Sequence, residues 1–217
     1  MQKLQDIFEI LLSIILPKDS TTILLETIGM EEINTLPKAN ILDDGTYRSL
    51  FQYKNKTVRL AIWEIKYKAN RKITALFSKL LYEFILEEIV DEIVFSNFQN
   101  PLLIPIPASK GRLRERGFNQ CEYITKEIQK LDTQNFFETN FHALRKIKET
   151  PHQSKLKNKE KRLKNLRGCF LADPTLVAGR NIILIDDVIT TGQTMREAAK
   201  TLRNAGAKKV IGFAIAH

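Results

Sequence analysis

The sequence predicts an α/β fold built on an open, mainly parallel sheet. Residues 102–106 and 182–185 are short, uninterrupted apolar runs, which are typical of strands buried on both faces. Helical spacing of apolar residues follows over 192–205, and a further apolar run occupies 209–215. Strand, helix and strand in that order require a crossover between parallel strands, so the sheet is expected to be doubly wound.

Length and composition restrict the class of protein. A chain of 217 residues with 43% hydrophobic and 27% charged residues suits one domain with a core, and excludes disordered and fibrous classes. Two cysteines, Cys121 and Cys169, exclude a disulfide framework and a zinc site made of four cysteines. The apolar stretch 7–16 contains Glu9 and is too short to cross a bilayer, so we expect a cytoplasmic protein without a membrane span.

The N-terminal part divides into an extension and a group of elements that belongs to the main domain. Residues 1–46 are expected to form a helical extension, because apolar residues recur at helical spacing in its first part. A strand is expected over 47–53. Two helices joined by a short link are then expected over 56–69 and 71–93, and we call the elements within 47–95 the hood.

The main domain is predicted to span residues 47–217. After the strand at 102–106 the sequence has a basic loop punctuated by glycine, and then a helix over 119–131. A weaker strand is expected near 136–144. The strand at 182–185 and the elements after it complete the predicted sheet.

Most of the net charge of +9 lies in one stretch. Residues 145–167 contain ten of the 34 basic residues and two of the 25 acidic ones, which gives this stretch a net charge of +8. Thr150-Pro151 disfavours regular structure, and the lysine-rich part has no apolar stripe. We expect a mobile loop followed by a short polar helix, and the charge predicts an anion site, a nucleic-acid patch or a solvated loop.

The most informative segment is residues 182–194. Four apolar residues lead to the adjacent carboxylates Asp186 and Asp187, at the end of a parallel strand where ligands bind. Hydroxyls, backbone N–H groups and a helix N-terminus follow, a combination that favours a phosphate monoester. Carboxylates accept hydrogen bonds from sugar hydroxyls or hold Mg²⁺. A ribose that carries a 5′-phosphate satisfies both halves.

Other interpretations explain less of this segment. A response-regulator receiver has its acidic pair on the first strand, whereas only 30 residues follow Asp187 here. Helix capping by Thr190 or Thr194 explains one threonine and leaves the second carboxylate without a role. The glycine-rich loop of P-loop nucleotidases is missing from the sequence.

These residues closely resemble the 13-residue phosphoribosyl-pyrophosphate (PRPP) signature of type I phosphoribosyltransferases. Further blocks resemble the ComF competence family, in which many members begin with a four-cysteine zinc ribbon. Residues 1–46 contain neither cysteine nor histidine, so no zinc is expected. The blocks, in order, are Ile65-Lys66-Tyr67, Pro105-Ile106-Pro107, Arg-Gly-Phe-Asn-Gln at 116–120, Thr150-Pro151-x-Gln153 and Asn165-Leu-Arg-Gly168.

The resemblance implies a role for each part of the site. It implies a type I phosphoribosyltransferase-like sheet under a hood, and a PRPP ligand that brings Mg²⁺. Asp186 and Asp187 are then expected to bind the ribose hydroxyls and, indirectly, the Mg²⁺. The 5′-phosphate is expected at Thr190, Thr191, Gly192, Gln193 and Thr194, and the pyrophosphate at Pro107, Ala108, Ser109 and Lys110, with Arg116, Lys155 and Arg162 as further candidates in a lid.

Three functions stay open at this point. The first is transfer of a phosphoribosyl group to an unidentified acceptor, with release of pyrophosphate. The second, implied by the ComF resemblance, is a non-catalytic protein that binds single-stranded DNA, or competence and recombination proteins, during DNA uptake. The third is a regulator that senses PRPP. No residue is assigned as a general base; Trp63 and Tyr67 are candidates for stacking on a base or for packing in the hood, and the oligomeric state is left open.

Overall fold

A computed structural model of the chain describes residues 32–33, 35–39, 46–149 and 168–217. The chain divides into two compact units, Met1–Leu36 and Pro37–His217, and the second contains all the elements below. The N-terminal helical extension falls largely outside the described residues. The boundary expected at residue 46 stays a prediction, because residues 40–45 are outside them as well.

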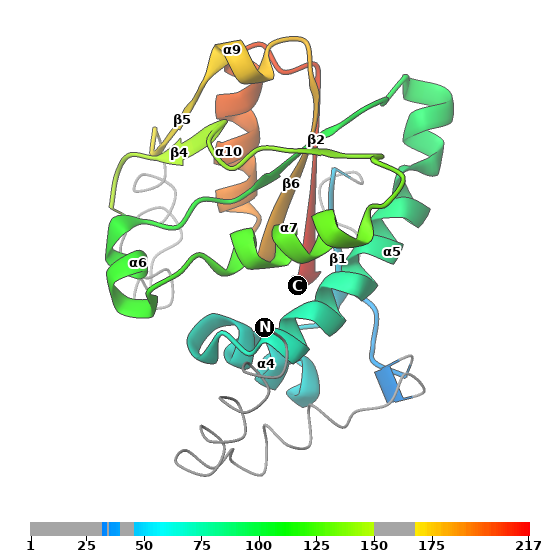
Figure 1. The fold of residues 1–217 in the computed structure, drawn as a ribbon, viewed down its shortest axis with the longest axis vertical. Coiled ribbons are helices and arrows are strands. Elements are labelled where there is room, and N and C mark those ends of the chain that lie inside the picture. Colours follow the sequence, from blue (N-terminus) through cyan, green and yellow to red (C-terminus); the bar gives the residue numbers. More distant parts are fainter. Residues whose placement is uncertain (1–31, 34, 40–45, 150–167) are drawn as a thin grey trace, which may run out of the picture. The chain divides into compact units, whose positions relative to one another are not determined.

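Five parallel strands form the central sheet, as predicted (Figure 1). β6 lies in the middle of the order β1-β7-β6-β2-β3, and each neighbouring pair is parallel. β6 therefore has a hydrogen-bonded strand on each side, and its sequence includes Asp186 and Asp187. The strands are β1 (Tyr47–Phe51), β2 (Leu102–Pro105), β3 (Glu138–Thr139), β6 (Asn181–Val188) and β7 (Lys209–Ala216).

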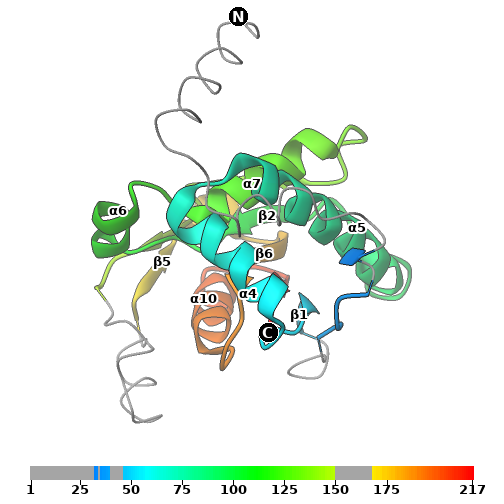
Figure 2. The ribbon, with the colours of Figure 1, turned by 90° about the horizontal axis from the view of Figure 1, so that it is seen from below.

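Helices cover both faces of the sheet, as expected for a doubly wound fold. Helices α5 (Arg71–Ser96) and α7 (Gln120–Leu131) lie on one side, and α10 (Gln193–Asn204) lies on the other (Figure 2). The strands are buried on both faces, which is why their sequences are continuous apolar runs rather than alternating ones. Among the described helices, none combines the length and the hydropathy needed to cross a membrane.

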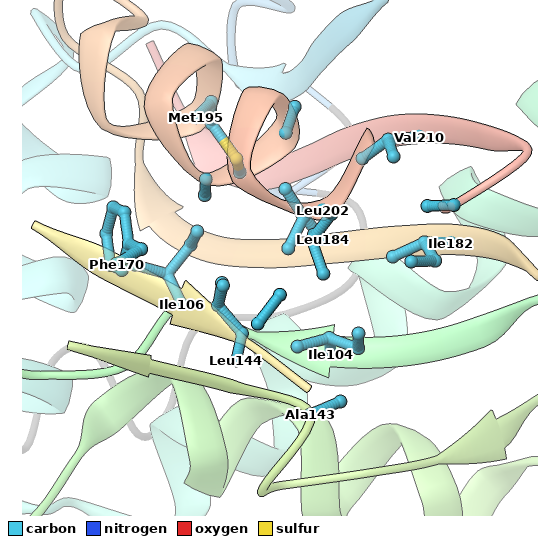
Figure 3. Close-up of a cluster of buried hydrophobic side chains, with 14 of the residues drawn as sticks. Ile104, Ile106, Ala143, Leu144, Phe170, Ile182, Leu184, Met195, Leu202 and Val210 are labelled. Atoms are coloured by element: carbon cyan, nitrogen blue, oxygen red, sulfur yellow. The ribbon is translucent and has the colours of Figure 1, made fainter. Parts of the chain in front are cut away.

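A cluster of buried side chains joins the sheet to α10 and to a small hairpin (Figure 3). The hairpin consists of the antiparallel strands β4 (Leu144–Lys146) and β5 (Phe170–Ala172), and it is followed by the short helix α9 (Pro174–Val177). Leu144 and Phe170 pack in the same cluster as Leu184 of β6 and Met195 of α10. Leu144 and Phe170, which flank the basic stretch in the sequence, are therefore held in the core.

The hood contains the two helices that the sequence predicts. Helix α4 (Lys56–Trp63) continues into a π-helix, η2 (Glu64–Lys68), and α5 follows after a short link. Asn55 and Asn70 cap α4 and α5, each by accepting a hydrogen bond from a backbone N–H with its side-chain oxygen. Ala69 adopts the left-handed conformation with φ of 49°, which ends η2 before the next helix.

Three predictions about local structure are corrected. The basic loop after β2 contains a helix, α6 (Lys110–Arg116), which Ser109 caps at one end and Gly117, with φ of 81°, ends at the other. This helix has one apolar residue, so no apolar period reveals it.

The strand expected near 136–144 is in fact two strands in different sheets. The Asn140 side chain accepts hydrogen bonds from the N–H groups of His142 and Ala143, and this turn separates β3 from β4. The loop expected from residue 145 onward begins as strand, because Arg145 and Lys146 pair with β5. The rest of that stretch from residue 150 to 167, including Lys155 and Arg162, lies outside the described residues.

Candidate functional site

A cavity of about 630 Å³ lies at the carboxyl ends of β2 and β6. Its walls come from the hood, from the residues after β2, and from the loop between β6 and α10. In an open parallel sheet this edge is the usual place for a ligand. The structure thus brings together the acidic pair and the residues that the sequence predicts to hold a phosphate.

Asp186 and Asp187, the acidic pair, occupy the end of β6 and have different surroundings. The Asp186 carboxylate accepts hydrogen bonds from the Cys121 thiol, at 3.3 Å, and from the backbone N–H of Asp187, at 2.9 Å. Burial, together with the charge of Asp187, raises the pKa of Asp186 to about 7. Burial and the two carboxylates also hold the pKa of the Cys121 thiol well above its ordinary value, so the thiol keeps its proton and donates it in the hydrogen bond to Asp186.

Asp187 contacts a cation that the sequence did not lead us to assign. The ammonium of Lys66, on η2, lies 3.2 Å from Asp187 Oδ2. Burial acts to lower the pKa of Lys66, but the charges of Asp187 and Asp186 outweigh it and hold the pKa above its ordinary value. Lys66 falls in one of the blocks that resemble the ComF family, which was the available signal.

The predicted phosphate site, residues 190–194, leads into the start of helix α10 and contains buried polar atoms without a hydrogen-bond partner among the described residues. Gly192 has φ of 73° and precedes α10, whose N-terminus has no side-chain cap. Thr191 Oγ1 and Gln193 Oε1 are buried and have no hydrogen-bond partner among the described residues. Arg196 closes the loop by donating to the Thr191 carbonyl at 2.7 Å. Free helix N–H groups beside an unpaired hydroxyl suit a phosphate.

The four residues predicted for pyrophosphate divide into two pairs. Pro107 and Ala108 line the cavity, whereas Ser109 and Lys110 are outside its wall and begin α6, with Ser109 as the cap. Arg116 does line the cavity; it donates to Gln120 Oε1 at 3.0 Å, and its guanidinium lies 4.9 Å from the centre of the Tyr67 ring.

The cavity wall carries more positive than negative charge. Its only acidic residues are Asp186 and Asp187, against five basic ones among the described residues. Lys146, on β4, is one that sequence reasoning missed; burial, and then the charge of Arg112, lower its pKa. Such a wall favours a ligand with several negative charges. The basic residues are Arg59, Lys66, Arg112, Arg116 and Lys146.

Two aromatic side chains form part of the hood side of the cavity. Trp63 and Tyr67 are 46% and 47% exposed, and their ring centres are 5.9 Å apart. Their exposure shows that they are not core residues of the hood. Exposed aromatic faces next to cations can stack on a planar ligand.

Asp186 and Asp187 are the carboxylates at the cavity that could contact a magnesium ion. Within the described ranges, no group of three or more His, Cys, Asp or Glu side chains is arranged to hold a metal. Mg²⁺ is commonly held by one or two carboxylates together with substrate phosphates, and Asp186 and Asp187 offer such oxygens. These carboxylates fit a magnesium ion that arrives with a phosphorylated ligand, because the phosphates supply further oxygen ligands.

Comparison with known proteins agrees with the phosphoribosyltransferase resemblance of the sequence. A family model described as a phosphoribosyl transferase domain matches residues 130–217. Competence protein ComFC of Bacillus subtilis (strain 168) is 36% identical over 105 residues, which are 48% of this chain and 39% of that protein. DNA utilization protein YhgH of Escherichia coli O157:H7 is 30% identical over 152 residues, which are 70% of this chain and 63% of that protein.

Among solved structures, the allosteric regulatory enzyme of purine biosynthesis aligns with 17% identity and a TM-score of 0.42, over 70% of this chain and 29% of that one. Over residues 130–217 the chain therefore matches a phosphoribosyl transferase domain. Its similarity to proteins named competence protein F, competence protein ComFC and DNA utilization protein YhgH agrees with the ComF resemblance of its sequence. The chain spans less than two thirds of the length of these curated relatives.

The raised pKa of Asp186 predicts a cost to stability. A carboxyl whose pKa is raised from 3.8 to about 7 binds its proton more tightly in the folded state, so stability is lost as the pH rises through this range. Asp186→Asn keeps the acceptor oxygen and removes the charge. We expect the variant to exceed the original protein in free energy of unfolding by roughly 1–4 kcal/mol at pH 8, at about 1.4 kcal/mol per pKa unit, and by less at pH 5. Urea unfolding at both pH values measures this, and equal stabilities at pH 8 would contradict it.

Gly192 allows a test of the phosphate site. Its positive φ strains any other residue, and an added Cβ would lie 3.3 Å from the Arg196 guanidinium, which must then shift by a few tenths of an ångström. We expect Gly192→Val to abolish binding of ribose 5-phosphate in calorimetric titration. Gly179→Val is the matched control, because Gly179 has φ of 70° with open space around it and is outside the cavity wall. Equal dissociation constants for the two variants would place the phosphate elsewhere.

Proposed function

We propose that this protein binds PRPP with Mg²⁺ in the cavity and transfers its phosphoribosyl group to an acceptor, with release of pyrophosphate. One observation carries the proposal: the acidic pair, the start of α10 and a cationic wall meet at a single cavity. Sugar hydroxyls, a monoester phosphate and a pyrophosphate each find a matching group there.

Each part of PRPP has a place in this proposal. The ribose hydroxyls donate to Asp186 and Asp187, and the 5′-phosphate accepts from the N–H groups and hydroxyls of residues 190–194. The pyrophosphate extends toward Pro107 and Ala108, where Arg112, Arg116 and Lys146 supply positive charge. Arg112 and Lys146 come from α6 and β4, so two elements outside the signature contribute to the leaving-group end.

The chemistry follows from this placement. The bond between C1 of the ribose and the pyrophosphate oxygen breaks, and its electron pair stays on the pyrophosphate. C1 forms a bond to the nucleophilic atom of the acceptor, which loses a proton to the solvent. Cations held at the pyrophosphate end stabilise the charge that develops there in the transition state. Mg²⁺, when bound with the pyrophosphate, supplies further charge neutralisation.

The acceptor is expected on the hood side of the cavity. Tyr53, Arg59, Trp63 and Tyr67 form this side, and Trp63 is the only tryptophan of the chain. A planar acceptor that stacks on Trp63 therefore changes the intrinsic fluorescence. A screen of bases and amines, read by fluorescence and by pyrophosphate release, identifies the acceptor.

A second candidate function is the binding of single-stranded DNA during DNA uptake, without catalysis. The names of the relatives, competence protein and DNA utilization protein, favour it. Aromatic rings interleaved with cations, as at Trp63, Tyr67 and Arg116, also suit unpaired bases and phosphates. Oligonucleotides that compete with PRPP, with no pyrophosphate released from PRPP in the presence of any acceptor, would favour this function over transfer.

Asp187 provides the test of PRPP binding. Asp187→Asn keeps the shape and removes the charge at the ribose, so we expect the affinity for PRPP with Mg²⁺ to fall at least about tenfold, or about 1.4 kcal/mol, the scale of one charged hydrogen bond. Titration followed by Trp63 fluorescence and by calorimetry measures this. Asp91→Asn, an exposed carboxylate on α5 outside the cavity wall, is the control and should bind as the original protein does. An unchanged affinity in Asp187→Asn would refute the assignment.

A further inference from the structure

We infer that Lys66 is a built-in counter-ion of the acidic pair, which lets the site bind a phosphorylated ribose without a divalent cation. The inference rests on the proposed function and concerns the ribose and its 5′-phosphate alone. Under it, Mg²⁺ serves the pyrophosphate end of PRPP, and Lys66 serves the ribose end.

The contact between Lys66 and the acidic pair is both close and enclosed. The Lys66 ammonium lies 3.2 Å from Asp187 Oδ2, and the two side chains are 20% and 4% exposed. This ion pair joins the hood to the predicted ligand strand. Lys66 thus reaches the site from a segment about 120 residues earlier in the sequence.

The local structure fixes the position of Lys66. It lies in the middle of η2, and π-helical turns occur frequently at functional sites. Glu64, which is 2% exposed, pairs with Lys68 at 3.0 Å and accepts from Asn70 Nδ2 at 3.1 Å. Asn70 also caps α5. The turn is therefore secured on both sides of Lys66 by contacts that do not involve the cavity.

Electrostatics gives Lys66 its role. Two adjacent carboxylates with little exposure repel each other, and a phosphate dianion a few residues away adds to the repulsion. A divalent cation is one way to offset this charge. Lys66 offsets it without a metal, because its ammonium is already at the carboxylate that is expected to receive the ribose hydroxyls.

A purely structural role for Lys66 makes a different prediction. If the pair only held the hood to the sheet, its loss would lower stability and weaken every ligand, whether or not a metal is present. If Lys66 is a counter-ion, the loss of ligand affinity should instead depend on the metal, because an added divalent cation can replace the charge of the missing ammonium. The dependence of binding on Mg²⁺ therefore separates the two roles.

The experiment compares Lys66→Met with Lys68→Met, using ribose 5-phosphate as the probe. Lys68 lies two residues away on η2, also pairs with a buried carboxylate, and is outside the cavity wall. Calorimetric titration is made in EDTA and in MgCl₂, and thermal unfolding of each variant is measured alongside. The original protein should bind equally in both conditions. Lys66→Met should lose roughly tenfold in affinity in EDTA and regain most of it with Mg²⁺, whereas Lys66→Arg and Lys68→Met should remain independent of the metal.

The opposite results overturn the inference. Equal losses for Lys66→Met in EDTA and in MgCl₂, or the same metal dependence in Lys68→Met, would assign Lys66 a structural role only. If the original protein binds ribose 5-phosphate only with Mg²⁺, the counter-ion role is refuted while the proposed function stands. If it binds neither ribose 5-phosphate nor PRPP in any condition, the proposed function itself fails, and the inference fails with it.

Discussion

Two adjacent carboxylates at the end of a buried strand are the constraint on which the rest of the site depends. Adjacent residues of a strand point to opposite faces, so Asp186 and Asp187 make different direct side-chain contacts. Asp186 meets the Cys121 thiol at the start of α7, and Asp187 meets Lys66 from the hood. Helices from two distant parts of the chain must therefore lie against the same strand end, which is what creates a cavity there.

This arrangement favours function over stability. Burial of the acidic pair raises the pKa of Asp186 to about 7, so the folded protein loses stability when this carboxyl is charged. An apolar side chain at this position would not have this cost. Arg112, Arg116 and Lys146 around the cavity would also pair with a bound anion, and so would the Thr191 hydroxyl, which has no hydrogen-bond partner among the described residues. A ligand with hydroxyls at one end and phosphates at the other relieves these unfavourable features together.

The sequence alone predicted the elements whose residues follow one regular pattern. The apolar runs of β2 and β6, the helical spacing of α4, α5 and α10, and the motif around Asp186 were all recognised. Helix α6 was missed because it lacks an apolar period, and the hairpin was missed because three-residue strands give no pattern. Lys66 and Lys146 act through contacts between segments far apart in sequence, and only packing of the hood and the hairpin brings them to the cavity.

The central claim is that the β6–α10 junction binds the phosphate of a phosphorylated ribose. Two-dimensional NMR of the ¹⁵N-labelled protein, titrated with ribose 5-phosphate and separately with ribose, tests it directly. We expect saturable shifts of the backbone amides of residues 190–195 with ribose 5-phosphate, and much weaker ones with ribose, because the helix N–H groups donate to the phosphate. Unmoved amides at this junction, with saturable shifts at another surface, would contradict the account.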